Sequence, residues 1–369
     1  MLRAALAALI SFALLVPAWG QDPVDIYQRK KKKKTKKQEE PVTQVLPLPK
    51  DLPGAITVET QRLIFHVSPI STKGLLTQQT RDAIRALWGQ TRGATIVKLR
   101  AFVAGSGDTR RIQQLVSEMF AEHKSPLPAL STVLVGSLGT EGAQVIIEAI
   151  SLDKRNVNPN GLAFISGQAA KSYAESLAGL RAAVRAAGAT ESDLLRVTCF
   201  VNSFEGTESD RQANPPLGGA YTLVQMRREA APTVAECEAV ARLSKAPSTA
   251  VQLLNPEGLT KSPNYSQIAL VSAQKIVFSS LQMAFHSQDA DIKLAYERLG
   301  RMLESQGVRY ADVFMMSTYA LSQDAIDKVR AVRFNYFDKN RPPASTLLPF
   351  EGLPALEASF GVEVVAAAQ

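Results

Sequence analysis

The 369-residue sequence predicts an α+β protein built from three tandem units. Three segments share one pattern, in which a helix with apolar residues at three-to-four spacing ends at a glycine and leads into an apolar strand. A further strand with alternating apolar residues around a glutamate closes each unit. Because this order recurs three times, one supersecondary arrangement repeats along the chain.

The helix-to-strand junctions carry the clearest local signal. Glycine lacks a Cβ and therefore takes the left-handed conformation that ends a helix. The junctions and their strands are Gly93 before 96–103, Gly188 before 194–201 and Gly307 before 312–321. The closing strands are 145–151, 235–241 and 361–367, around Glu148, Glu238 and Glu363. We expect these three glutamates to be exposed on a sheet or salt-bridged rather than catalytic.

A second helix is predicted in two of the units, over 112–123 and 325–339. The equivalent stretch of the second unit, 204–219, contains prolines and glycines that predict a loop. Units of about 90–120 residues have the normal size of a domain. A solenoid is the alternative, but solenoid repeats are about 20–45 residues long. The predicted unit boundaries are 51–153, 154–248 and 249–369.

Composition restricts the possible functions. The chain is 46% hydrophobic and 21% charged, which excludes disorder throughout. Its net charge of +8 is matched by eight cationic residues between Arg29 and Lys37, so the remainder is close to neutral. A folded face that binds nucleic acid specifically is therefore not expected.

The N-terminal region predicts export. Residues 1–20 combine Arg3, an apolar run over 4–16 and small residues at 18–20, the pattern of a signal peptide. A membrane anchor is the alternative, but the run is shorter than the roughly 20 residues that span a bilayer, and no other transmembrane segment is predicted. The product is expected to be secreted, in the periplasm. Residues 21–50 are a lysine-rich disordered linker, either a solvated spacer or a contact to an anionic surface.

The sequence predicts no metal and no cofactor. Its two cysteines, Cys199 and Cys237, either pair in an oxidising compartment or are buried as thiols, and both readings stay open. The histidines lack metal-ligand spacing. The nearest candidate for a phosphate loop, 104–108, has no following lysine and is expected to be a strand-to-helix turn.

Three stretches together resemble the RidA family, the reactive imine and enamine deaminases also called YjgF-like or L-PSP endoribonuclease-like proteins. The stretches are GLAFISGQ at 161–168, GAT-x-x-DLLRVTCFV at 188–201 and the end of the third unit at 340–368. The resemblance covers about residues 55–368. It implies a chorismate-mutase-like fold with a mixed sheet backed by two helices, and homotrimers with a central barrel and ligand clefts between subunits. Three copies in one chain imply an intramolecular pseudo-trimer that remains a monomer.

The resemblance also implies a chemistry and the residues that carry it. Family members hydrolyse imines or enamines with an arginine that clamps the substrate carboxylate, because a guanidinium holds both oxygens. The matching positions hold Leu130, Ala220 and Ala344, so none of the three keeps the arginine. The family's acidic residue on the closing strand is kept as Glu236, while the other units have Ile146 and Gly361.

The surviving family positions predict one composite site. Glu236 is its catalytic candidate, and the candidate ligand-binding residues are Ser166, Gly167 and Tyr265. Arg330 and Arg333 on the second helix of the third unit are candidates to replace the lost arginine. The alternative is that these are strand and loop residues kept by ancestry, with both arginines on a solvated helix face.

These observations favour a divergent RidA-like protein that binds a small metabolite, possessing no arginine clamp of the family type. The ligand class suggested by the resemblance is an imine or an amino-acid-derived metabolite. The first alternative is a hydrolase of the 2-iminobutanoate/2-iminopropanoate deaminase kind that uses a single cleft. Endoribonuclease activity is a lower alternative, because the folded body offers no basic face.

Overall fold

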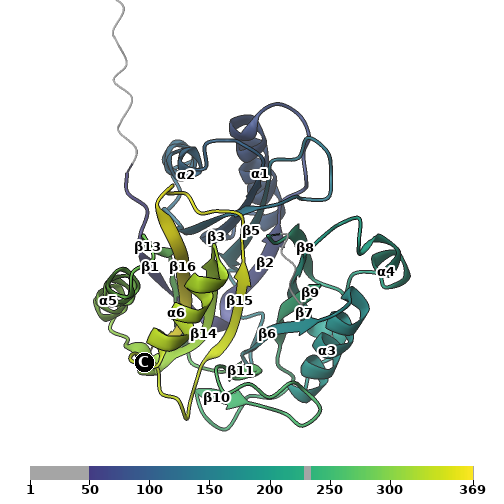
Figure 1. Ribbon diagram of the computed structural model, residues 1–369, viewed down its shortest axis with the longest axis vertical. Coiled ribbons are helices and arrows are strands. Elements are labelled where there is room, and N and C mark those ends of the chain that lie inside the picture. Colours follow the sequence, from purple (N-terminus) through teal and green to yellow (C-terminus); the bar gives the residue numbers. More distant parts are fainter. Residues whose placement is uncertain (1–49, 228–233, 369) are drawn as a thin grey trace, which may run out of the picture. The chain divides into compact units, whose positions relative to one another are not determined.

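The computed structural model describes residues 50–227 and 234–368 (Figure 1). In this part of the chain the strands form three separate mixed sheets, covered by a small number of helices. This confirms the α+β class. The predicted signal peptide and the lysine-rich linker up to residue 49 lie outside the described residues. None of the helices that are described is long and apolar enough to cross a membrane.

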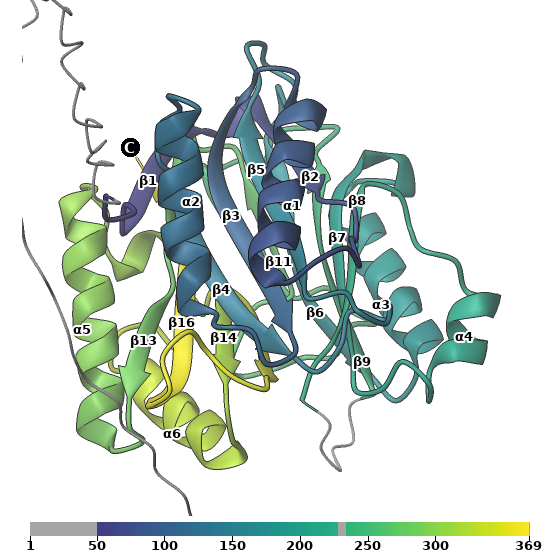
Figure 2. The same ribbon diagram turned by 90° about the horizontal axis from the view of Figure 1, so that it is seen from above.

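The first sheet has the strand order β2-β5-β3-β4. β3 and β4 pair in parallel and the other pairs are antiparallel. Two helices, α1 and α2, lie together on one face of this sheet (Figure 2). The elements are β2 (Leu63–Val67), α1 (Leu76–Thr91), β3 (Thr95–Ala104), α2 (Arg110–Glu122), β4 (Ala129–Val135) and β5 (Val145–Leu152).

The second sheet has the order β10-β11-β6-β9-β7-β8. Its main helix packs on β6 and β9, and a six-residue helix, α4, lies beside that main helix. The elements are β6 (Leu162–Ala170), α3 (Tyr173–Ala186), β7 (Leu194–Val201), α4 (Glu208–Ala213), β8 (Ala220–Gln225), β9 (Ala235–Arg242), β10 (Val251–Leu254) and β11 (Ile268–Val271).

The third sheet has the order β1-β12-β16-β14-β15, and β13 also pairs with β16. Helices α5 and α6 contact each other and cover this sheet. The elements are β1 (Ala55–Glu59), β12 (Lys275–Ser279), β13 (Gln282–Phe285), α5 (Asp289–Ser305), β14 (Val313–Ala320), α6 (Gln323–Arg333), β15 (Ala344–Pro349) and β16 (Ala358–Ala368).

The predicted junctions between helices and strands are present, and two predictions need correction. Gly93, Gly188 and Gly307 all have positive φ after their helices, as expected. The helix predicted over 325–339 ends at Arg333, because the aromatic residues that follow pack onto α5; the rings of Tyr336 and Tyr296 stack 5.0 Å apart. The loop predicted over 204–219 contains α4, which contacts α3 through a hydrogen bond from the Ala174 amide to Asp210.

Sheet membership does not follow chain order. β1 lies next to β2 in sequence but pairs with β12 of the third sheet, with Ala55 opposite Ser279. In the same way β11 pairs with β6 of the second sheet, with Ile268 opposite Ile165. A strand that precedes one sheet in sequence thus extends the neighbouring sheet, which ties the sheets to one another.

A network of buried charges lies where the three sheets meet. The Arg100 guanidinium donates to Glu148 at 2.7 Å and to Glu238 at 2.8 Å, and the Lys98 ammonium donates to Glu363 at 2.6 Å. Burial alone would raise the pKa of Glu363, but Lys98 and Arg100 lower it to about 2. The three recurring glutamates are therefore buried and ion-paired, and are not exposed on a sheet.

Hydroxyl groups extend this network in a cycle around the three sheets. Thr198 of the second sheet donates to Glu148 of the first at 2.5 Å. Ser131 of the first sheet donates to Glu363 of the third at 2.5 Å, and Thr346 of the third donates to Glu238 of the second at 2.7 Å. Each sheet therefore supplies a donor to one neighbour and a carboxylate to the other.

The central barrel expected from the resemblance is not closed. The described strands pair within the three sheets, and between sheets there are only isolated bridges, such as Leu134 with Gly352 and Ser266 with Ala344. Single bridges cannot form a continuous ladder. Buried side chains join the sheets instead.

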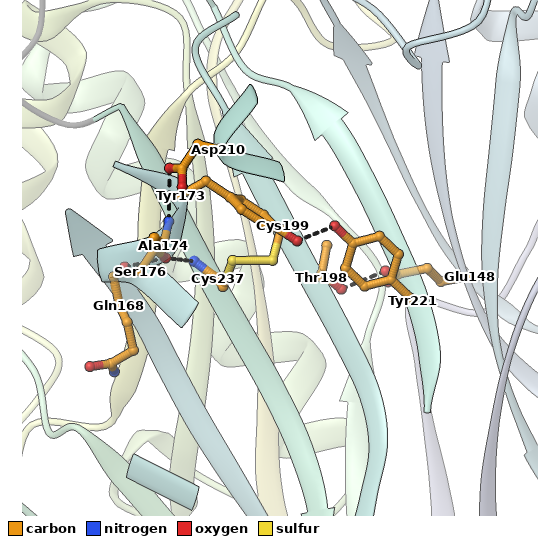
Figure 3. The surroundings of a disulfide bond; sticks show 10 residues. All are labelled: Glu148, Gln168, Tyr173, Ala174, Ser176, Thr198, Cys199, Asp210, Tyr221 and Cys237. Atoms are coloured by element: carbon orange, nitrogen blue, oxygen red, sulfur yellow. Dashed lines mark hydrogen bonds between the residues drawn. A yellow bond between two sulfur atoms is a disulfide. The ribbon is translucent and has the colours of Figure 1, made fainter. Parts of the chain in front are cut away.

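The two cysteines form a disulfide, which settles the choice that the sequence left open. Cys199 on β7 and Cys237 on β9 are directly opposite each other and fully buried (Figure 3). The Cys237 amide also donates to Ser176 of α3 at 2.9 Å. The bond fixes the strand that carries Glu236 against its neighbour.

Breaking the central network should destabilise the whole described body. Lys98→Met would leave Glu363 buried without its ammonium partner, and we expect a loss of about 3–5 kcal/mol in the free energy of unfolding. Arg155→Met is the control, because the Arg155–Asp153 pair is exposed and should contribute less than about 1 kcal/mol. Urea unfolding of both variants provides the measurement. Equal midpoints for the two variants would contradict this role of the network.

Candidate functional site

A cavity of ≈ 350 Å³ lies between the second and third sheets, and we call it the arginine cleft. One wall comes from β6, β9 and the segment before β11, and the other from α6 and β15. Polar and charged side chains dominate its lining. They are Asn202, Arg227, Glu236, Ser262, Asn264, Tyr265, Gln323, Arg330, Arg333 and Ser345.

Glu236 is the cleft's carboxyl group, and it is 7% exposed. Among residues 50–227 and 234–368 it has no hydrogen-bond or ion-pair partner. Burial and the nearby Glu238 raise its pKa to about 8, because both disfavour the charged form. The side chain fits only because residue 167 is glycine: a Cβ there would lie 1.8 Å from the Glu236 Oε1.

Arg333 is the second unusual group, because its guanidinium is buried without a partner. The residue is 2% exposed, and its Nε and Nη2 form no hydrogen bond within the described part of the chain. The ring of Phe334 lies 5.4 Å from the guanidinium carbon. Burial lowers the pKa of Arg333. An unpaired buried charge is strongly unfavourable, so an anion in the cleft would stabilise this arrangement.

Tyr265 and Arg330 line the same cavity as these two groups. Burial and then Glu236 raise the pKa of Tyr265, and Arg330 acts in the opposite direction, so all three lie within electrostatic range. Arg330 is half-exposed and 3.7 Å from Asp327 on its own helix. Arg227 adds a third cation to the lining. With Glu236 protonated near neutral pH, the lining carries an excess of positive charge.

The five predicted site residues gather at this cleft in two layers. Glu236, Tyr265 and Arg330 line the cavity. Ser166 and Gly167 lie behind its wall and contact β15: the Ser166 hydroxyl accepts from the Ser345 amide at 2.9 Å, and the Gly167 amide donates to Thr346 at 3.1 Å. Ser166 is fully buried, so its role is to join the two sheets.

The strand registers correct the alignment of the lost arginine positions by one residue. Ala129, Ala220 and Ala344 occupy the same place in the three parallel strand pairs, opposite Lys98, Arg196 and Met315. The residues equivalent to Leu130 are therefore Tyr221 and Ser345, and not Ala220 and Ala344. Tyr221 is engaged by Tyr173, with their hydroxyl oxygens 2.8 Å apart (Figure 3). None of the corrected positions is an arginine.

Several lining residues had no signal in the sequence. Asn202 and Arg227 follow the ends of β7 and β8, and Asn264 precedes β11, but none belongs to a motif. In the described residues no three His, Cys, Asp or Glu side chains are grouped as metal ligands. The arrangement offers cations for a carboxylate, together with an acid that can exchange a proton near neutral pH.

Comparisons with known proteins give partial structural matches. No family model and no curated protein matches the chain. A Rid-family protein of unknown function from Yersinia pestis matches 32% of this chain and 100% of its own length, with 18% identity and a TM-score of 0.29. A YjgF/YER057c/UK114-family member from Mycobacterium tuberculosis matches 25% and 79%, with 21% identity and a TM-score of 0.24. A YjgF-family protein from Neisseria meningitidis matches 32% and 95%, with 16% identity and a TM-score of 0.24.

Proposed function

We propose that this protein binds a small metabolite with a carboxylate group in the arginine cleft. The observation that carries the proposal is the buried guanidinium of Arg333 in the lining, whose Nε and Nη2 have no hydrogen-bond partner among residues 50–227 and 234–368. A carboxylate can accept two hydrogen bonds from one guanidinium, and Arg333 brings such a group to the lining of the cleft. Arg330 in the same lining also favours an anion.

One charged site per chain is expected. The positions equivalent to Glu236 hold Ile146 and Gly361, so neither of the other sheets has the acid. At the same distance from its N-cap, α2 has Phe120 where α6 has Arg333, and Phe120 belongs to the hydrophobic core of the first sheet. The charged residues of the arginine cleft therefore have no counterparts elsewhere in the repeat.

Replacing Arg333 should weaken binding without loss of stability. Arg333→Met keeps an unbranched side chain and removes the charge, so 2-oxobutanoate should bind at least about tenfold more weakly, as for a lost charge-assisted hydrogen bond. Isothermal titration calorimetry measures this. The variant's free energy of unfolding should stay equal or rise, because the unpaired charge is gone.

The control for this experiment is Arg301→Met, since Arg301 is an exposed arginine on α5 outside the cleft. It should bind 2-oxobutanoate as the wild type does. Equal affinity in wild type and Arg333→Met, or no binding by the folded wild type, would refute the proposed function.

The raised pKa of Glu236 predicts that the free energy of unfolding depends on pH. On folding, the pKa of Glu236 rises from 4.5 to about 8, so between these values the folded state keeps a proton that the unfolded state has lost. The free energy of unfolding therefore falls as pH rises through this window. Glu236→Gln removes this loss and should gain stability relative to wild type, by several kcal/mol between pH 5 and pH 8. Urea unfolding at several pH values tests it, with exposed Glu59→Gln as the control; parallel curves for Glu236→Gln and wild type would contradict the raised pKa.

A second candidate function is imine hydrolysis in the same cleft. Glu236 favours it, because a pKa of about 8 suits an acid and base working near neutral pH. In this reaction water adds to the C=N carbon while ionised Glu236 accepts a proton from the water. The carboxyl then gives this proton to the nitrogen, which leaves a hydroxyl group and an amino group on the same carbon. Glu236 next accepts the hydroxyl proton and passes it to the nitrogen as the C–N bond breaks, so that ammonia and a carbonyl compound are released.

Ammonia release from 2-aminoacrylate separates binding from hydrolysis. For a hydrolase, the rate should rise with pH towards about 8 and fall at least about a hundredfold in Glu236→Gln. Intact binding of 2-oxobutanoate in that variant would show that its fold is preserved. If the wild type binds 2-oxobutanoate but releases ammonia only at the uncatalysed rate, the hydrolase proposal is contradicted and the protein is a binding protein.

Export and an intramolecular pseudo-trimer are part of the proposal. The Cys199–Cys237 disulfide supports a secreted, periplasmic protein, because such bonds persist in oxidising compartments. The cyclic hydrogen bonds from each sheet to the next support three units that stand in for three subunits. The linked arrangement removes the dependence of assembly on concentration.

A further inference from the structure

We propose that a second cavity, between the first and third sheets, binds an uncharged molecule that has an apolar part and a hydrogen-bonding group. This cavity measures ≈ 270 Å³, and we call it the neutral cleft. It lies between β4 and α2 on one side and the segment joining β12 to β13 on the other. The inference does not depend on the ligand proposed for the arginine cleft.

The strand registers show that the two clefts are built from equivalent positions. Phe164 and Phe278 hold equivalent positions, because each pairs with the residue two places after the recurring glutamate of its sheet. Gly167 and Leu281 each come three residues later, so they correspond to each other. The strand pairs Ile268–Ile165 and Ala55–Ser279 are also equivalent. Tyr265 and Leu52 each lie three residues before the first member of its pair, so they correspond to each other. Three residues of the arginine cleft or its wall, Tyr265, Ser345 and Gly167, are thus replaced in the neutral cleft by Leu52, Leu130 and Leu281.

The two clefts differ at the position of the acid and at the position of the glycine beside it. Where one cleft has a large side chain, the other has glycine. In the arginine cleft the Glu236 carboxyl lies against Gly167. In the neutral cleft Leu281 occupies the position of that glycine, and Gly361 stands where the acid would be. A Cβ on Gly361 would lie 2.8 Å from Leu281 Cδ1. The leucine therefore takes the space that the carboxyl group has in the arginine cleft. The neutral cleft is still a cavity, but it has no acid at this position.

The neutral cleft carries no unpaired charge. Arg110 is the one charged residue among the described residues that line it, and Asp108 accepts from its guanidinium Nε and Nη2 at 2.9 and 3.0 Å. A charged ligand would lose its hydration here without gaining a free partner of opposite charge. Apolar walls from the leucines favour a ligand that removes apolar surface from water.

The hydroxyl group of a lining residue supplies the polar contact. Thr132 lines the neutral cleft and is 4% exposed, yet its side chain has no hydrogen-bond partner in the described part of the chain. The equivalent residue of the arginine cleft is Leu347, so the hydroxyl is particular to this cavity. The hydroxyl belongs to a residue that lines the cavity, and it can exchange a hydrogen bond with an alcohol or amide there.

The test uses 1-hexanol as the uncharged probe, hexanoate as its charged counterpart, and two matched variants. Gln113→Trp fills the mouth of the neutral cleft from an exposed position on α2, and Gln323→Trp does the same for the arginine cleft from α6. Saturation-transfer NMR and calorimetry on the folded proteins measure binding. We expect hexanol to bind wild type and Gln323→Trp alike and to lose at least about tenfold in affinity in Gln113→Trp.

Thr132→Val removes the hydroxyl group with little change of side-chain shape. It should lower the affinity for hexanol about five- to tenfold. Hexanoate should not compete with hexanol. The proposal is overturned if the folded wild type binds no hexanol up to its solubility limit, if Gln323→Trp abolishes binding, or if Gln113→Trp and Thr132→Val leave it unchanged. Binding of 2-oxobutanoate, measured in the same variants, reports on the arginine cleft independently.

Discussion

Five charged side chains buried where the three sheets meet constrain the rest of the structure. Two of their ion pairs cross between sheets, Lys98 with Glu363 and Arg100 with Glu238. Arg100 also binds Glu148 of its own sheet. A buried charge is tolerated only with its partner in place, so each sheet holds its register relative to the other two. The clefts between sheets inherit this fixed geometry, since their walls are the outer ends of the same strands.

With the backbone arrangement held in this way, side chains in the clefts can change without loss of the fold. One cleft keeps the pair Gly167 and Glu236, and the equivalent cleft has Leu281 and Gly361. The guanidinium of Arg333 stands at a helix position that is filled by Phe120 in the first unit. The charged groups of one cleft therefore reflect local substitutions on a common framework, and the two cavities are suited to ligands of different chemistry.

The sequence predicted the helix-to-strand junctions because glycine caps and alternating apolar residues are local signals. It also brought Glu236, Tyr265 and Arg330 together by resemblance, and the structure puts these three on one cavity. Pairings between distant strands have no local signal, which is why the exchange of β1 and β11 and the register of Tyr221 and Ser345 were missed. The burial of Glu148, Glu238 and Glu363 was missed because their cations come from other strands, two of them from β3.

The most direct test of the account is a crystal structure of the protein with 2-oxobutanoate bound. The account predicts the carboxylate within hydrogen-bond distance of the Arg333 guanidinium, in the cavity that Glu236 and Tyr265 also line. It also predicts that the remainder of the ligand points towards Glu236. A carboxylate bound away from Arg333, with the guanidinium still unpaired, would contradict the central claim that this buried charge is there to hold an anion.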